Sequence, residues 1–407
     1  MIYNTIYKDN KAPYFLATMM IFGIAAGLFN GVLNNYLHEV LHVSKLERGV
    51  VELPREVPGL LLIVLISLLY RICEIRILRL AFLVSMVGMV GIIYVGDIRI
   101  TAVLMIVLWS TGEHMMMPLR QAIAVHMAQP GKGGLALGAI RSVRNLGQLA
   151  GYYLIPLVFI VFPMRGIVKG SFPYFRFFFL ITLIILLFGL GTSLGIGKSD
   201  RHIQRRRLYF HKKYRKYYIL ELFFGARKQI FFTFAPYVLI IRYGIQTEML
   251  ALLYGIASTA NIFIAPLVGR GIDRFGYRII IIIDTILLIL LCGLYGYAHR
   301  ILPYSAAYIT VGIVFVIDSI LFVVTMARTM YVKSISSSKE EVMATLSTGI
   351  SINHLISILI AILGGVLWAK LGIEVLFSIA ALFGFGSFLF SMTLPKDRIH
   401  NKPPIRA

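Results

Sequence analysis

The sequence of 407 residues predicts an all-α membrane protein of about twelve transmembrane helices, arranged as two pseudo-symmetric bundles of six. Apolar residues make up 58% of the chain and charged residues only 14%, whereas about a quarter of the residues in soluble domains are charged. The apolar residues gather in runs of about 18 or more, and about 20 helical residues cross a ~30 Å hydrocarbon layer. A hydrophilic, strongly basic stretch lies near the middle of the chain.

Each apolar run is expected to be helical, because lipid-exposed backbone N–H and C=O groups have no water with which to form hydrogen bonds. The predicted spans of the first half are 14–37, 49–70, 78–96, 101–127, 134–162 and 173–196. Those of the second half are 217–241, 247–268, 278–297, 303–330, 341–369 and 373–394. We therefore expect one bundle over 1–196, a basic cytoplasmic linker over 197–216, and a second bundle with a short basic tail over 217–407.

The distribution of basic residues predicts the topology. The stretch Lys198–Lys216 holds nine Lys and Arg residues and one acid, Asp200. Most of the remaining Lys and Arg residues outside the spans lie on the same side as this stretch, so the positive-inside rule places both termini in the cytoplasm of a multi-pass protein of the cell membrane. The net charge of +22 is thus assigned to topology and lipid contact, and no nucleic-acid partner is expected.

Two sets of residues recur at fixed offsets and indicate a duplicated half. Arg120 and Asn145 recur as Arg328 and Asn353, both at an offset of 208 residues. In the loops after the second and eighth spans, the acids Glu74 and Asp273 each lie between two arginines at a common offset of 199 residues. These coincidences fit a parallel repeat of two related six-helix halves.

The segment Gly269–Arg278 fits the pattern G-x-x-x-D-R-x-G-x-(R/K) and resembles the loop signature of the major facilitator superfamily. The resemblance implies a secondary transporter for a small molecule, with no enzymatic activity. In that family this loop acts as a conformational latch, a role that an acid can perform by pairing with arginine and with a helix N-terminus. The role is carried here to Gly269, Asp273, Arg274, Gly276, Arg278 and, in the first-half copy, Glu74; the alternative is a basic turn that only fixes topology.

Charged residues within spans are costly unless they are paired or hydrated, so each one is a functional candidate. Glu113 on the fourth span and Arg144 on the fifth lie at similar depth, and we predict that they form a pair facing a cavity. Arg144 would bind an anionic group of the substrate. Asn30, Asn34, Asn145 and Asn353 are the further candidates for substrate binding.

Proton coupling has three candidates, Glu113, His114 and Asp318, because a buried carboxyl or imidazole group can take up and release a proton. The alternative is a static hydrogen-bonded network that holds helices together. Arg227, Lys228 and Gln229 are expected either to line a positive vestibule or to extend their side chains to the membrane surface.

One motif favours a different class of protein. His38, Glu39 and His42 match H-E-x-x-H, which on a helix holds zinc in metalloproteases, but here it lies at the outer end of the first span and lacks a third ligand. We therefore expect no enzyme, metal or cofactor.

The sequence predicts a secondary active transporter of a small solute such as an organic anion or amphiphilic metabolite, working by alternating access and coupled to protons. The alternatives are a drug or metabolite efflux permease and a non-transporting sensor. The sequence does not determine the oligomeric state, and a monomer is compatible with it.

Overall fold

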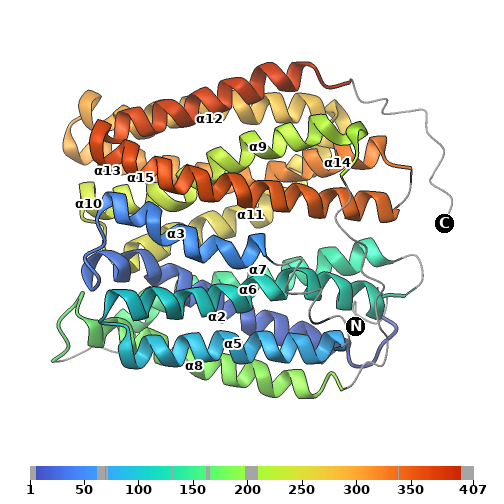
Figure 1. Ribbon diagram of the computed structural model, residues 1–407, viewed down its shortest axis with the longest axis horizontal. Helices are drawn as coiled ribbons and strands as arrows, with labels where there is room; N and C mark the ends of the chain where they lie inside the picture. The colour runs from blue at the N-terminus through green and yellow to red at the C-terminus, as the bar shows by residue number, and fades with distance from the viewer. Residues whose placement is uncertain are drawn as a thin grey trace. The chain divides into compact units, whose positions relative to one another are not determined.

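The computed structural model describes residues 6–61, 69, 72–129, 132–161, 166–197, 210–337 and 339–395. All regular secondary structure among them is helical, with one isolated bridge between Tyr7 and Ala128 (Figure 1). Eight helices of this described part are long and apolar enough to cross a membrane. The predicted all-α membrane fold is therefore confirmed. Part of the predicted span 49–70, most of the linker, and the basic tail lie outside the described residues.

Chain contacts define two compact units. Unit 1 comprises Met1–Val43, Pro54–Arg205 and Gln246–Gly255. Five helices of its described residues lie wholly within it: α2 (Ala12–Glu39), α5 (Glu74–Val95), α6 (Arg99–Met127), α7 (Gly133–Val161) and α8 (Phe172–Leu194). Unit 1 also holds the end of α3 (Lys45–Leu60) and the beginning of α11 (Thr247–Phe275).

Unit 2 comprises Ser44–Leu53, Arg206–Ile245 and Ile256–Ala407. Its helical elements besides the parts of α3 and α11 are η1 (Lys212–Tyr214), α9 (Arg215–Gln229), η2 (Ile230–Phe234), α10 (Ala235–Tyr243), α12 (Tyr277–Ile301), α13 (Tyr304–Leu321), η3 (Phe322–Val324), α14 (Thr325–Ile335) and α15 (Lys339–Met392).

Two predicted spans of unit 2 have interruptions that the apolar pattern does not reveal, whereas the break between the last two spans lies where the sequence predicts it. The span 217–241 is divided by the π-helical turn η2, and Pro236, which lacks an N–H donor, is the second residue after it. Gly372 separates the last two spans within α15, where its φ of 91° breaks the helix without an intervening loop. The span 303–330 is likewise divided by a short 3-10 turn.

The tightest packing in unit 1 is between α2 and α7, where glycines allow backbone to meet backbone. A Cβ atom built at Gly27 would lie 2.1 Å from the carbonyl oxygen of Gln148. One built at Gly147 would lie 2.1 Å from the carbonyl oxygen of Met20. The small residues of α2 therefore form a face that packs closely against α7. The contact also fixes the position of α7, which carries Arg144.

The described end of the linker is anchored to unit 2. The hydroxyl of Tyr214 lies 2.9 Å from that of Ser336, and the ammonium of Lys213 lies 3.4 Å from the carboxylate of Glu341. The backbone N–H of Ser337, followed by Tyr214, lowers the pKa of Glu341 to about 2. The carboxylate is thus charged at neutral pH and holds this junction together.

The first prediction concerns the α2–α7 contact. Gly147→Ala should lower the apparent melting temperature of the purified protein in detergent, because the added methyl group meets a backbone carbonyl and overpacking costs about 1–3 kcal/mol or more. Gly138→Ala on the same helix is the matched control, since a Cβ there meets nothing within 4 Å and alanine favours a helix by up to ~1 kcal/mol. Equal destabilisation by the two substitutions would contradict the close backbone contact.

Candidate functional site

The predicted pair between Glu113 of α6 and Arg144 of α7 is present in unit 1. Nη2 of Arg144 lies 3.2 Å from Oε1 of Glu113, and both side chains are largely buried. Nη1 of Arg144 donates to Oε1 of Gln148 at 3.2 Å, and Gln148 donates to the hydroxyl of Tyr152 at 2.9 Å. The ring of Tyr152 stacks on that of Tyr254, with centroids 5.2 Å apart. One face of α7 therefore carries a connected polar row.

The surroundings of Arg144 are positively charged. Arg120 lies close enough to interact electrostatically with Glu113, Arg141 and Arg144. This cluster thus contains three guanidinium groups and one carboxylate, of which only Arg144 pairs directly with Glu113, and Nε of Arg144 has no hydrogen-bond partner among the described residues. This local excess of positive charge leaves hydrogen-bonding capacity for an anion.

The asparagines predicted for substrate binding lie in different environments. On α2 of unit 1, Asn34 is buried and Asn30 is partly buried. Asn145 on α7 is exposed, although it directly follows Arg144. Asn353 belongs to unit 2, where it is buried and hydrogen-bonded as described below.

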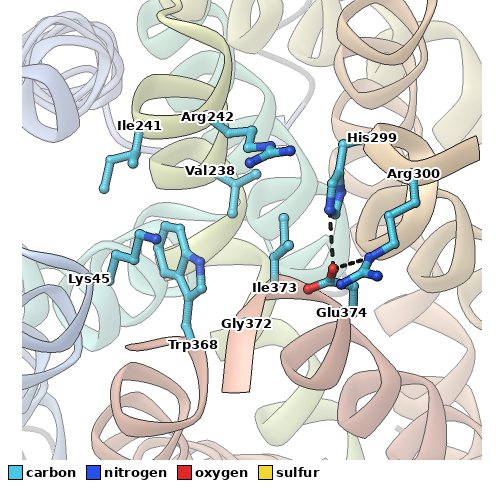
Figure 2. A pocket seen from close by; sticks show the side chains of 10 residues that line it. All are labelled: Lys45, Val238, Ile241, Arg242, His299, Arg300, Trp368, Gly372, Ile373 and Glu374. Atoms are coloured by element: carbon cyan, nitrogen blue, oxygen red, sulfur yellow. Dashed lines mark hydrogen bonds and ion pairs between the residues drawn. The ribbon is translucent and has the colours of Figure 1, made fainter. Parts of the chain in front are cut away.

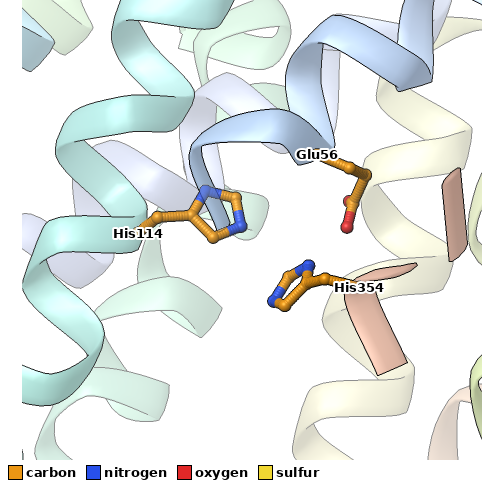
Figure 3. Close-up of side chains that lie close together, drawn as sticks. All are labelled: Glu56, His114 and His354. Atoms are coloured by element: carbon orange, nitrogen blue, oxygen red, sulfur yellow. The ribbon is translucent and has the colours of Figure 1, made fainter. Parts of the chain in front are cut away.

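His114 of α6 is buried within unit 1. Its Nδ1 lies 2.8 Å from the carbonyl oxygen of Ser110 and 3.1 Å from the hydroxyl of the same residue. Glu56 of α3 is buried beside it, with a carboxylate oxygen and an imidazole nitrogen within 4.8 Å of one another (Figure 3). A carboxylate next to an imidazole can exchange a proton with it, which fits the predicted candidacy of His114.

Asp318 of α13 is buried in unit 2, and its partner is Arg227 of α9. Nη2 of Arg227 donates to Oδ1 of Asp318 at 2.7 Å, and Nη1 lies 3.7 Å from Oδ2 of Asp284 on α12. Only 2% of Arg227 is exposed, so both sequence interpretations of that residue, a vestibule lining and a side chain reaching the surface, are wrong. The guanidinium instead joins two acidic residues from two other helices.

The carboxylates of Asp284 and Asp318 differ in the strength of their contacts with Arg227. Asp284 lies 1 Å farther from Arg227 than Asp318 does, and its Oδ1 has no hydrogen-bond partner among the described residues. Sequence reasoning did not select Asp284. It could have been found as an acidic residue within the long apolar run of the ninth span.

A second buried network lies next to this one in unit 2. Nε of Arg328 donates to Glu221 at 2.8 Å, and Nδ2 of Asn353 donates to the other carboxylate oxygen at 3.5 Å. Lys228 donates to Oδ1 of Asn353 at 2.8 Å. Arg328 and Asn353 were selected through their recurrence with Arg120 and Asn145, but Glu221, which joins them, was not selected. Together the two networks hold three acids and three bases, so unit 2 balances its buried charge.

The loop signature forms a helix-to-helix turn in unit 2. α11 ends at Phe275, Gly276 adopts a φ of 84°, and α12 begins at Tyr277. The N–H of Gly276 donates to the carbonyl of Ile272 at 2.8 Å, so this glycine supplies a left-handed turn that other residues rarely adopt. The guanidinium of Arg274 lies over the ring of Phe275. The side chain of Asp273 is outside the described part, and the latch role of Gly269 and Arg278 stays a prediction.

Glu74, the first-half counterpart of Asp273, lies in the first turn of α5 in unit 1. It is buried, and Oε2 lies 3.2 Å from Nδ1 of His126 on α6. The acid therefore contacts an adjacent helix of its own unit at the end of the span.

The H-E-x-x-H match does not form a zinc-binding helix. α2 ends at Glu39, and His42 has a φ of 47°, outside helical geometry. The two imidazoles are therefore not one helical turn apart on a common face, which that kind of metal site requires.

The fold and the buried charges within apolar helices define a class, the multi-pass membrane proteins with polar networks inside their helical bundles. A family model described as Major Facilitator Superfamily matches residues 15–352, and the chain belongs to this family. It is a transporter embedded in the lipid bilayer that acts on small molecules, and it is not an enzyme. No curated protein sequence matches the chain.

Solved structures share the fold at low sequence identity. A mutant of the nucleoside transporter NupG has a TM-score of 0.75 and 13% identity, over 95% of this chain and 100% of that one. A D-xylose-proton symporter has a TM-score of 0.76 and 13% identity, over 97% of this chain and 100% of that one. A POT family transporter in complex with 5-aminolevulinic acid has a TM-score of 0.72 and 13% identity, over 95% and 96%.

The second prediction concerns the acids around Arg227. Asp318→Asn and Arg227→Gln should each lower stability by about 3–5 kcal/mol, because each leaves a buried charge without its main partner. Asp284→Asn should cost clearly less, since the short Arg227–Asp318 pair remains. Thermal unfolding of the purified variants in detergent measures the order, and a loss in Asp284→Asn as large as in Asp318→Asn would refute it.

Proposed function

We propose that this chain is a secondary active transporter of a small organic anion that works by alternating access. The two bundles, 1–196 and 217–407, would expose the bound solute to one side of the membrane and then to the other. The latch residues of the loop signature would stabilise one of these states. A monomer is compatible with this mechanism.

The observation that supports an anionic substrate is the excess of positive charge around Arg144. If Glu113 alone balanced Arg144, the unit 1 cluster would be neutral and would not select anions. Arg120 and Arg141 add two positive charges to that pair. A carboxylate or phosphate group of the substrate would complete the balance by accepting from Arg144, with Gln148 and Tyr152 next to it. Asn30 and Asn34 of α2 are the further candidates in this unit.

Proton coupling is proposed for unit 2, and Asp284 is added to the candidate Asp318. Asp284 is the less firmly held carboxylate, so its protonation disrupts fewer contacts than protonation of Asp318. Uptake of a proton by Asp284 would remove its attraction to Arg227 and leave the Arg227–Asp318 pair as the remaining contact. The charge of the network would change by one. Such a change in the packing of α9, α12 and α13 could bias one conformation over another. Glu113 and His114 are the corresponding candidates in unit 1.

The D-xylose-proton symporter has a similar fold, which is compatible with proton coupling but does not assign it to this chain. The topology proposed is that of the cell membrane with both termini in the cytoplasm, as the positive-inside rule predicts. Efflux of drugs or metabolites is the second candidate function. It is favoured less, because a cluster with three arginines and one acid repels lipophilic cations.

The third prediction tests the anion site. Organic anions such as dicarboxylates and sugar phosphates should raise the melting temperature of the purified protein, because ligands that bind the native state stabilise it by mass action. The shift should disappear in Arg144→Gln and be partly retained in Arg144→Lys. Arg176→Gln, on an exposed residue of α8, is the control. Stabilisation by lipophilic cations that persists in Arg144→Gln would instead support efflux.

The fourth prediction tests coupling. In proteoliposomes loaded with a pH-sensitive dye, addition of an anion selected by the thermal screen should change the internal pH. Asp284→Asn should abolish this pH change while retaining exchange of labelled for unlabelled anion, because exchange does not require the proton to dissociate. An unaltered pH change in Asp284→Asn would exclude this residue as the proton site, whereas loss of both activities would indicate a structural role.

A further inference from the structure

A pocket within unit 2 lies away from the buried networks, where several helices begin or end. Its volume is ≈640 Å³. It is formed by Lys45 at the start of α3, Arg242 near the end of α10, His299 and Arg300 at the end of α12, and the kink of α15 at Gly372 (Figure 2). The pocket thus lies where α12, an apolar helix of candidate spanning length, ends.

The charge of the pocket is strongly positive. Its one acid, Glu374, lies 3.2 Å from Nε2 of His299 and also accepts from Nε of Arg300. This leaves Lys45 and Arg242, which are both exposed and have no carboxylate partner among the described residues. Figure 2 shows the guanidinium of Arg242 between Trp368 and the Glu374 cluster. The pocket therefore holds two positive charges that the protein does not balance.

Gly372 adds the positive end of a helix. Its φ of 91° starts a new helical segment at Ile373, so the N–H groups of that segment's first turn lie at the pocket. A Cβ built at Gly372 would lie 2.7 Å from Oε2 of Glu374, so a side chain there would displace the acid. The glycine thus shapes both the helix start and the position of Glu374.

One wall of the pocket is apolar and aromatic. Trp368 contacts Lys45, whose Nζ lies 5.5 Å from the ring centroid, and Val238, Ile241 and Ile373 complete this wall. The volume falls in the range of about 300–1,000 Å³ that is usual for small-molecule sites. The pocket thus combines unbalanced cations with a surface for an organic group.

We infer that this pocket binds a phosphate ester, with the phosphate on Arg242 and Lys45 and its organic part against Trp368. Phosphate suits the site because it carries up to two negative charges and several acceptor oxygens for these donors. The same chemistry occurs in the head group of an anionic phospholipid and in soluble phosphate esters. The inference is independent of the proposed transport site in unit 1.

The experiment measures thermal stabilisation of the full-length protein in detergent by two probes, dihexanoyl phosphatidylglycerol and glycerol 1-phosphate. Dihexanoyl phosphatidylcholine and sodium chloride at equal ionic strength are the ligand controls. The variants are Lys45→Gln/Arg242→Gln, the matched control Arg176→Gln on unit 1, and Glu374→Gln. We expect the double variant to weaken the apparent affinity for the active probe by about tenfold or more, and Arg176→Gln to change it less than about twofold.

The outcomes distinguish a phospholipid ligand, a soluble phosphate ester and the absence of phosphate binding. Stabilisation by phosphatidylglycerol alone identifies a lipid site, and equal stabilisation by glycerol 1-phosphate identifies a site for soluble esters; both support the inference if the double variant loses the effect. Tighter binding in Glu374→Gln would support it further, since the pocket loses its one negative charge. No stabilisation by either probe, or an effect unchanged in Lys45→Gln/Arg242→Gln, would overturn it.

Discussion

A charged side chain inside an apolar helix is costly unless an opposite charge or water compensates it, and much of the structure of unit 2 follows from this constraint. Arg227 is satisfied only if α9, α12 and α13 come together, because its two acids lie on the other two helices. Glu221 requires α14 and α15 in the same way. The lipid offers little drive for helices to associate, so these polar contacts specify which helices are neighbours.

The two units meet this constraint differently. In unit 2, three acids face three bases, and the buried charge is balanced within the protein. In unit 1, the cluster around Arg144 holds one carboxylate, Glu113, which pairs with Arg144, and Arg120 lies near both of them and near Arg141. We propose that the balanced network of unit 2 responds to a single proton and that the positively charged cluster around Arg144 accepts an anion. This difference divides the proposed tasks of substrate binding and coupling between the bundles.

Sequence reasoning predicted the features that depend on composition and depth. Apolar runs located the helices, and equal depth on consecutive spans identified the Glu113–Arg144 pair. It did not predict that Arg227 is buried, because its partners come from spans that are distant in the sequence, and only the packing of unit 2 brings them together. Asp284 is visible in the sequence as an acid within an apolar run, but its contact with Arg227 depends on the same packing. The interruptions at η2 and η3 are not predicted, since both segments keep the apolar composition of a continuous span. The break at Gly372, in contrast, falls between the predicted spans 341–369 and 373–394.

The kink at Gly372 has a mechanical consequence. The last two spans are joined by a single residue with positive φ, Gly372, and no loop lies between them. A loop of several residues would absorb the displacement of one helix before the next one moved. Here the two helical segments are joined by one residue, so a tilt of the segment that begins at Ile373 directly displaces the segment that carries Asn353.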